Sequence, residues 1–219
     1  MHEIDQKNLK KFLDKENKDI KILDVGCGLG TNIQLMESWG FKNIFGTDIS
    51  QEMLKECEEK GLNVSLSEDL SDSKFDLLLF SHVIEHISYP EIINFLEFYF
   101  SKLEDGGRVI IITPCQYTGF YNDIDHIKPY YPNALINCFS KKKMSRQYGS
   151  DFNLVLRDIH FRKEVIANFD VRSGYINDFQ NKIIRNLRRK FFNILNVMTF
   201  GSLSKTTGYA ALFHISYDK

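Results

Sequence analysis

A glycine-rich turn directly after a short apolar segment constrains the fold of this sequence more than any other feature. Residues 20–25 form an apolar run typical of a buried strand, and Gly26, Gly28 and Gly30 follow it with the spacing GxGxG. Glycines there let the chain turn sharply and leave backbone N–H groups free at the start of the next helix, where they can bind a ligand. The pattern predicts a strand–turn–helix unit that cradles a ligand.

Two common phosphate-binding loops do not fit this turn. A dinucleotide fingerprint needs a third glycine where this chain has Thr31, and no Gly-Lys-Ser/Thr sequence is present to bind a nucleoside triphosphate. Asp48 ends the next predicted strand, and a carboxylate there can accept hydrogen bonds from both hydroxyls of a ribose. The turn and Asp48 together predict a ribose-containing ligand. The alternative is a turn that only packs a helix on a sheet.

Strands and helices alternate through the first half of the sequence. Apolar strands are predicted at 20–25, 43–47, 63–66, 75–81 and 108–113, and helices at 3–16, 31–39, 50–60 and 90–103. Thr31 and Ser50 are the expected N-caps of two of these helices. After Pro114 the pattern changes. Loops and up to two helices are expected over 115–165, then a strand at 169–176, a helix at 178–198 and a strand at 208–217.

This alternation predicts an α/β fold, a doubly wound, mostly parallel, seven-stranded sheet with helices on both faces. A length of 219 residues suits one domain over 1–219. Its ligand-binding core would cover about 20–113. A small cap, together with the loops and helices on the side where a second reactant would bind, would come from about 114–206.

Composition narrows the partners and the location. The net charge of −1 argues against a chain built to bind nucleic acid, so a small molecule is the expected partner. The four cysteines form no CxxC pair, which indicates neither a disulfide framework nor a zinc ribbon. Residues 1–18 hold no apolar run, so neither a signal peptide nor a membrane span is expected there. These features predict a cytoplasmic protein.

Four motifs in order carry a resemblance to a known family. LDVGCGLG, GTDIS, FDLLLFSHVIEHI and LEDGGRVIIITP resemble the ordered motifs of class I S-adenosylmethionine-dependent methyltransferases, over roughly residues 20–127. More narrowly, they are similar to a broad bacterial group that includes ubiquinone-type O-methyltransferases and surface-polysaccharide methyltransferases. The resemblance implies a Rossmann-like methyltransferase fold with S-adenosyl-L-methionine as cofactor.

The resemblance also implies roles for particular residues. The methionine and ribose side of the cofactor would be lined by Asp24, Gly26, Gly28 and Gly30. Asp48 would hold the ribose hydroxyls, and Ile49 would lie against the adenine. Asp69 is the candidate for the adenine amino group, with a solvated turn residue as the alternative. His82 would stand beside the transferred methyl group.

The stretch from His82 through Glu85 to His86 has the pattern HxxEH and allows three interpretations. An inverted zinc-protease motif would need a helix here and a further acid downstream. A divalent-metal site is found in the similar methyltransferases that contain the sequence ExxEH. In this chain His82 replaces their first acid, which disfavours an oxygen-preferring ion. The favoured interpretation has no metal: His82 borders the cofactor, while Glu85 and His86 orient the next helix or touch the acceptor.

A loop beyond the fifth predicted strand supplies the candidate catalytic base. Residues 123–130 resemble the family segment D-x-x-H-x-[RK]-x-[FY], which implies a loop that closes over the acceptor. Methyl transfer to a hydroxyl requires removal of its proton, and histidine titrates nearest neutral pH. His126 is therefore the first candidate for the general base, His86 the second and His160 the third. The alternative for His126 is a loop histidine that only bonds Asp123 or Asp125.

Two basic clusters complete the candidate features. One holds Lys141, Lys142, Lys143 and Arg146, and the other lies in the predicted helix at 178–198 and holds Lys182, Arg185, Arg188, Arg189 and Lys190. The simpler interpretation is a solvated face of an amphipathic helix. The other is a surface for a phosphorylated ligand or RNA. Aromatic contacts to a sugar ring could come from Tyr117, Tyr121, Tyr130 and Tyr131.

The favoured hypothesis is methyl transfer from S-adenosyl-L-methionine to a hydroxyl, or as second choice an amine, of a small polar acceptor. A sugar or a phosphorylated intermediate of surface-glycan biosynthesis fits best. One alternative is an RNA methyltransferase that uses the basic clusters. Another is a non-catalytic relative that binds the cofactor as an assembly partner.

Overall fold

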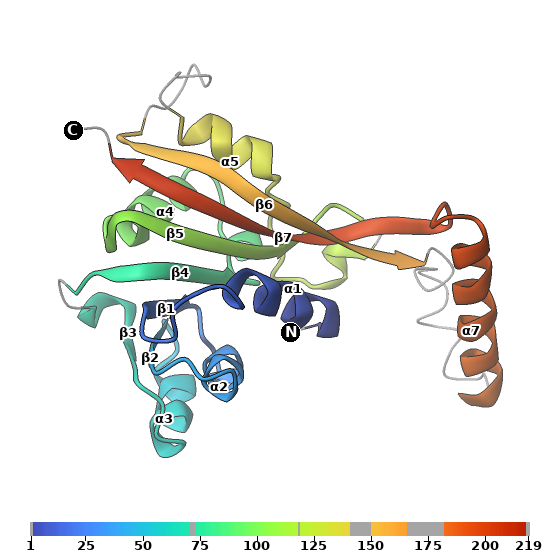
Figure 1. Cartoon of the computed structure of the whole chain (residues 1–219), viewed down its shortest axis with the longest axis horizontal. Helices are drawn as coiled ribbons and strands as arrows, with labels where there is room; N and C mark the ends of the chain where they lie inside the picture. Colours follow the sequence, from blue (N-terminus) through green and yellow to red (C-terminus); the bar gives the residue numbers. More distant parts are fainter. Residues whose placement is uncertain (1, 71–72, 118, 141–149, 166–181, 218–219) are drawn as a thin grey trace.

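Seven strands form one sheet in the order β3-β2-β1-β4-β5-β7-β6 (Figure 1). The computed structural model describes residues 2–70, 73–117, 119–140, 150–165 and 182–217. The strands are β1 (Lys21–Val25), β2 (Asn43–Asp48), β3 (Val64–Leu66), β4 (Phe75–Ser81), β5 (Leu103–Pro114), β6 (Phe152–Val165) and β7 (Ser204–Tyr217). The first five pair in parallel, whereas β7 runs antiparallel to β5 and β6. The predicted α/β class and the mostly parallel, seven-stranded sheet are confirmed.

Helices cover both faces of the sheet. They are α1 (Glu3–Leu13), α2 (Thr31–Ser38), α3 (Gln51–Glu59), α4 (Glu91–Phe100) and α5 (Pro132–Cys138). The described residues also form α7 (Lys182–Met198), which stands apart from the sheet, and the single 3₁₀ turns η1 (Ser67–Asp69), η2 (Ile84–His86) and η3 (Phe120–Asn122) (Figure 1). Successive strand residues point to opposite faces, so Ile22 packs in the core under α1, α2 and α3, and Leu23 in the core under α4 and α5. Strands buried on both faces explain the apolar runs in the sequence.

The order of the strands creates the crevice for a ligand. From β1 the chain moves outward through β2 to β3, and then returns to place β4 on the other side of β1. At such a reversal the connecting loops separate beyond the carboxyl ends of the strands, and open α/β sheets bind their ligands there. The glycine turn after β1, Asp48 at the end of β2 and His82 after β4 all lie at this edge.

Differences from the predicted elements in the first half concern boundaries. Thr31 is the first residue of α2 and not its N-cap; Gly30 occupies the cap position with a φ of 76°. Ser50 does cap α3, and its hydroxyl accepts a hydrogen bond from the Met53 N–H. Residues 104–107, expected as a turn before the fifth strand, belong to β5, which begins at Leu103.

The second half differs more from expectation. Residues 152–165, predicted as part of a stretch of loops and helices, form the strand β6. The strand predicted at 169–176 lies outside the described residues, as does the cluster Lys141, Lys142, Lys143 and Arg146. The helix predicted at 178–198 is confirmed from Lys182 onward, and the last strand begins at Ser204, four residues before the predicted 208. Among the described residues, no helix has both the length and the apolar content needed to cross a bilayer.

Candidate functional site

Close packing allows no side chain at two glycines of the turn, Gly26 and Gly30, and leaves open space at the third, Gly28. Gly26, Gly28 and Gly30 have φ values of 70°, 52° and 76°, a region that favours glycine. A Cβ on Gly26 would lie 2.5 Å from Val83, and one on Gly30 only 2.2 Å from Leu62, so packing also requires these two glycines. Around Gly28 the nearest atom to such a Cβ is the Met53 sulfur at 3.9 Å. The backbone at Gly28 therefore faces space that a ligand can enter.

Asp24 is a buried acid near the end of β1 with an unused acceptor atom. Its Oδ1 accepts a hydrogen bond from Asn32 Nδ2 at 3.4 Å, whereas Oδ2 has no hydrogen-bond partner among the described residues. Burial raises the pKa of Asp24 to about 7, although the Asn32 hydrogen bond opposes this shift. An orphaned carboxylate oxygen is expensive to bury. A cationic group such as the ammonium of a methionine moiety would compensate it.

Asp48 joins β2 to the glycine turn. Its Oδ2 accepts a hydrogen bond from the Gly28 N–H at 2.9 Å, and its Oδ1 accepts one from the Ser50 N–H at 3.0 Å. Each carboxylate oxygen retains a second lone pair for a hydroxyl. The next residue, Ile49, is 89% exposed, so a flat apolar group can rest on it. Asp69 ends η1 as an exposed residue. The acceptor oxygens of Asp24 and Asp48 and the open space at Gly28 fit the S-adenosyl-L-methionine predicted from the sequence.

His82 stands at the end of β4 in a conformation that side chains rarely adopt. Its φ is 58°, and its N–H donates to the Ile112 carbonyl at 2.8 Å. Left-handed φ values outside glycine store about 1–2 kcal/mol and concentrate at functional sites. The ring lies between two acids, with Nε2 at 3.3 Å from Asp5 Oδ2 and Nδ1 at 3.2 Å from Glu85 Oε1. Burial lowers the pKa of His82, but these two carboxylates outweigh it and hold the pKa above its ordinary value.

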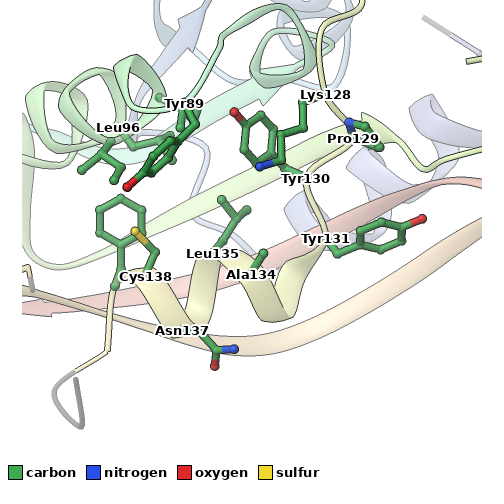
Figure 2. A pocket seen from close by; sticks show the side chains of 13 residues that line it. Tyr89, Leu96, Lys128, Pro129, Tyr130, Tyr131, Ala134, Leu135, Asn137 and Cys138 are labelled. Carbon is green, nitrogen blue, oxygen red and sulfur yellow. The ribbon is translucent and has the colours of Figure 1, made fainter. Parts of the chain in front are cut away.

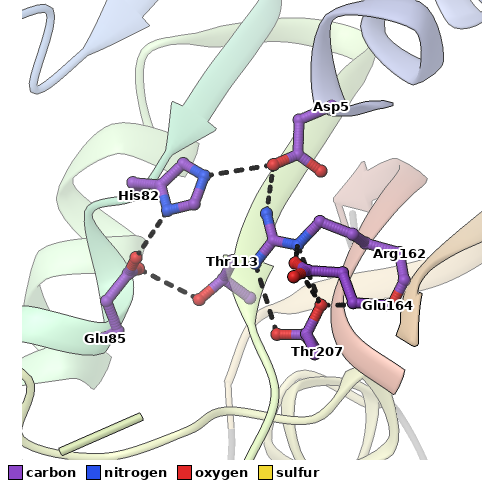
Figure 3. A network of polar contacts seen from close by, with 7 residues as sticks. All are labelled: Asp5, His82, Glu85, Thr113, Arg162, Glu164 and Thr207. Carbon is purple, nitrogen blue, oxygen red and sulfur yellow. Dashed lines mark hydrogen bonds and ion pairs between the residues drawn. The ribbon is translucent and has the colours of Figure 1, made fainter. Parts of the chain in front are cut away.

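A buried polar network continues from His82 to α1, β6 and β7 on one side and to η2 and β5 on the other (Figure 3). Asp5 of α1 accepts a hydrogen bond from the Arg162 guanidinium of β6, and both side chains are buried. Arg162 also donates to the hydroxyl and the carbonyl of Thr207 in β7, at 3.2 and 3.3 Å. On the other side, the Thr113 hydroxyl of β5 donates to Glu85 at 3.0 Å. The network fixes α1 and the β6–β7 pair against the loop that carries His82.

Sequence reasoning missed most of this network. The sequence places Asp5 in the helix predicted at 3–16 and Arg162 in the stretch 115–165, which is predicted to hold loops and helices. Two signals were present. Asp5 shares a helical face with the apolar Leu9 and Phe12, which is an unusual place for an acid. Gly208 interrupts a strand, and a Cβ there would lie 2.6 Å from the Arg162 guanidinium, so the glycine makes room for it.

The two favoured base candidates lie side by side. The rings of His86 and His126 have centroids 5.0 Å apart. His126 Nδ1 lies 2.7 Å from the Phe120 carbonyl oxygen, and His86 Nδ1 lies 3.0 Å from that of Asp125. A carbonyl only accepts, so each Nδ1 carries the proton in the neutral ring and each Nε2 keeps a lone pair. The Glu85 carbonyl accepts the N–H groups of Ile127 and Lys128 at 2.8 and 3.2 Å, which holds the loop on η2.

Glu85, His86 and His126 could also hold a metal ion. One ligand atom from each lies within 4.8 Å of the others. In the Glu85 carboxylate, Oε2 accepts the Thr113 hydroxyl and Oε1 lies 3.2 Å from His82 Nδ1. Two imidazoles and a single carboxylate offer too few oxygen ligands for magnesium. The protease interpretation of HxxEH does not fit, since the stretch forms a single 3₁₀ turn.

The third base candidate occupies a different setting. His160 lies on β6, its ring is stacked on Phe12 of α1 with centroids 5.2 Å apart, and its Nε2 is 3.5 Å from Asp158. His160 thus packs against the N-terminal helix.

A cavity of about 470 Å³ opens between α4, residues 128–131 and α5 (Figure 2). Its wall is mostly apolar, with Tyr89, Tyr130 and Tyr131 among its lining residues. Lys128 contributes the cation, and its Nζ lies 5.9 Å from the centre of the Tyr89 ring and 5.4 Å from that of Tyr130. Tyr89 and Lys128 lie three and two residues beyond the two clustered histidines, so the cavity is lined by the chain segments that follow them, although neither histidine lines it.

Comparison with known proteins agrees with this fold. The family described as "Methyltransferase domain" matches residues 2–159. An uncharacterised protein of Methanocaldococcus jannaschii is 33% identical over 107 residues, 48% of this chain and 44% of that protein. Phosphoethanolamine N-methyltransferase 1 of Arabidopsis thaliana is 28% identical over 119 residues, 49% of this chain and 24% of that protein. The matches thus span less than half the length of these two relatives.

Solved structures share the whole fold. A SAM-dependent methyltransferase from Archaeoglobus fulgidus superposes with a TM-score of 0.60 at 22% identity, covering 97% of this chain and 93% of that one. An S-adenosylmethionine-dependent methyltransferase from Mesorhizobium loti gives 0.52 at 12% identity, covering 90% and 91%. At these identities the likeness concerns the fold alone.

The strand order, the glycine turn and the carboxylate that ends β2 define the Rossmann-like class of S-adenosylmethionine-dependent methyltransferases. Because the family matches most of its length, the chain belongs to the methyltransferase domain family, as the sequence motifs predicted. S-adenosyl-L-methionine is the cofactor of this class.

Proposed function

We propose that this chain transfers a methyl group from S-adenosyl-L-methionine to a hydroxyl of a small polar acceptor. A sugar or a phosphorylated intermediate of surface-glycan biosynthesis is the favoured class. The observation that carries the proposal is the pair of histidines that clusters with Glu85 next to His82, each with Nδ1 committed to a backbone carbonyl. In the neutral rings Nε2 keeps the lone pair, and that of His126 lies 3.8 Å from Asp123 Oδ2. A hydroxyl acceptor needs such a base, whereas an amine that arrives unprotonated does not.

The residues of this chain orient the reactants and take up one proton. When bound, S-adenosyl-L-methionine supplies an electrophilic methyl group. Asp24, Asp48 and the glycine turn would hold the cofactor, and Nε2 of His126 would accept the hydroxyl proton as the acceptor oxygen bonds to the methyl carbon. The electron pair of the carbon–sulfur bond would stay on the sulfur, so that the second product is S-adenosylhomocysteine. Fixing the two reactants in line accounts for most of the acceleration in such a displacement.

The cavity beside the histidines supports a phosphorylated or glycosyl acceptor. Tyr89 and Tyr131 are about half exposed, so they can present aromatic faces to a sugar ring. Lys128 can pair with a phosphate as a point charge. The Arabidopsis thaliana relative is by its name an N-methyltransferase of phosphoethanolamine, a small phosphorylated acceptor that is methylated on nitrogen.

Asp48→Ala should weaken S-adenosylhomocysteine binding by about 1–3 kcal/mol, because the ribose hydroxyls and the Gly28 N–H lose a partly buried acceptor. Isothermal titration calorimetry measures the change. Asp76→Ala is the matched control: Asp76 lies near the amino end of the parallel β4, away from the cofactor edge, and accepts the Lys21 N–H. Unchanged affinity in Asp48→Ala, or tight NAD binding by the unaltered chain, would disprove the cofactor site.

Exhaustive chelation should leave the activity intact. The expectation rests on the small number of oxygen ligands at the cluster, where two imidazoles stand beside one carboxylate that already contacts Thr113 and His82. Turnover is measured before and after dialysis against a strong chelator, with the acceptor found by the screen described next. Activity that is abolished by the chelator and restored by magnesium or zinc would make Glu85, His86 and His126 a metal centre.

An extract-wide screen with labelled S-adenosyl-L-methionine tests the proposal as a whole. A labelled small polar product is the expected result. Label in RNA, with binding that weakens steeply with salt because phosphate contacts release counterions, would favour an RNA methyltransferase. Cofactor binding without transfer to any extract would favour a non-catalytic assembly partner.

A further inference from the structure

The helix α7 presents a row of large apolar side chains to solvent. Leu187, Phe191, Ile194 and Met198 follow one another at helical spacing and form one face of the helix. Their exposed fractions lie between 60% and 70%, and Val197 beside them is 76% exposed. Soluble proteins rarely leave such a continuous row uncovered. We call these five residues the apolar face of α7.

The same helix is strongly cationic. Its sequence from Lys182 to Met198 contains no aspartate or glutamate and five basic residues, namely Lys182, Arg185, Arg188, Arg189 and Lys190. The chain as a whole has a net charge of −1, so this positive charge is a local feature. Phe200, fully exposed with a φ of 52°, follows the helix and extends its apolar end.

The register of the sheet places α7 beyond the cofactor-binding edge. β7 pairs with β5 only as far as Gly208 opposite Pro114, the last residue of β5. The β6–β7 pair continues past that point to Val165 opposite Ser204. The resulting two-stranded arm carries α7 away from the helices that cover the sheet (Figure 1). The arm leaves the sheet on the side where the parallel strands end, which is the side of the site.

We propose that the apolar face of α7 docks this protein on the surface of an anionic phospholipid bilayer. A helix with an apolar face, a cationic remainder and too much charge to span a bilayer lies in the plane of the membrane interface. Its apolar side chains enter the headgroup region, and its Lys and Arg residues pair with the anionic headgroups. Docking in this way turns the cofactor-binding edge of the sheet toward the lipid.

Two other occupants fit the observations less well. A second copy of this chain would bring two helices with five basic residues each into contact, and their charges would repel. RNA would be bound through its phosphates, which leaves the row of exposed aliphatic side chains without a role.

Flotation of the full-length chain with lipid vesicles tests the proposal. Vesicles of phosphatidylcholine with about 30% phosphatidylglycerol should carry the protein, and raising the salt from about 0.1 M to 0.5 M should release it. Pure phosphatidylcholine vesicles should carry much less. The double variant Leu187→Ala/Phe191→Ala should weaken the partitioning about tenfold or more, because both side chains lose buried apolar area. Its melting temperature should stay close to that of the unaltered chain, since both residues are exposed.

The matched control is Asn193→Ala, which changes an exposed residue of the same helix without touching the apolar face. It should partition like the unaltered chain. Equal binding to neutral and anionic vesicles, no binding to either, or equal losses in both variants would overturn the proposal. So would a dimer in sedimentation equilibrium, or an RNA complex, that replaces vesicle binding.

Discussion

Replacing His126 with alanine should lower kcat by about 10²–10⁴-fold and leave the affinity for S-adenosylhomocysteine nearly unchanged. The imidazole is only 12% exposed and its Nδ1 is tied to the Phe120 carbonyl. Its Nε2, which lies 3.8 Å from Asp123 Oδ2, is the atom that can take the acceptor proton. Turnover is measured with the acceptor found in the extract screen.

Two histidine variants serve as comparisons for this result. His160→Ala should keep kcat, because His160 is stacked on Phe12 in another part of the fold. His86→Ala should have the smaller effect of the clustered pair. If His126→Ala instead raises KM and keeps kcat, His126 binds the acceptor, and a large loss in His86→Ala would make His86 the base. A His126 variant that matches the unaltered enzyme in both constants would remove the proposed mechanism.

The cofactor half of the molecule could be predicted from the sequence because its signals are local. The GxGxG spacing stands next to the strand that it follows, and Asp48 is adjacent to the end of its own strand. Each of these marks a backbone geometry that few residues can satisfy. The bounds of β4 were predicted without error, because a strand that is buried on both faces has a nearly continuous apolar sequence.

The strand β6 escaped prediction for a physical reason. It lies at the edge of the sheet, so much of it is exposed and its composition is polar. Its pairing with β7 shifts register between Leu156 and Asp158 and again between Arg162 and Lys163. Each irregularity shifts the alternation of buried and exposed side chains, so no regular period of two remains in the sequence.

The pairing of distant side chains could not be predicted either. Asp5 and Arg162 are separated by 157 positions, and only the finished sheet brings α1 and β6 together. The cluster of His86 and His126 likewise depends on hydrogen bonds from the loop to the Glu85 carbonyl. Contacts between residues that are far apart in the sequence depend on the topology of the folded sheet, and no local pattern in a single sequence indicates them.

Arg162→Met should destabilise the fold by about 3–5 kcal/mol, because it leaves the Asp5 carboxylate buried without its main partner. For a chain of this size the melting temperature should fall by roughly 6–20 °C. The loss should depend on pH. The pKa of His82 is raised above its ordinary 6.5, so its pairing with Asp5 is fully present below 6.5 and is lost as the pH rises through the folded-state value. Destabilisation should therefore be larger in alkaline than in mildly acidic buffer.

The double variant Asp5→Leu/Arg162→Met separates lost charge pairing from lost packing. When both charges are removed together, no uncompensated ion stays buried, and apolar replacements of a buried pair are often neutral. The double variant should thus recover much of the stability that Arg162→Met loses, and its melting temperature should lose most of the pH dependence. If the double variant is as unstable as Arg162→Met, the guanidinium contributes mainly by filling the space above Gly208. If Arg162→Met melts within a degree or two of the unaltered chain at every pH, the network does not hold α1 to the β6–β7 pair. The raised pKa of His82 would then come from Glu85, and the N-terminal helix would contribute little to the geometry of the site.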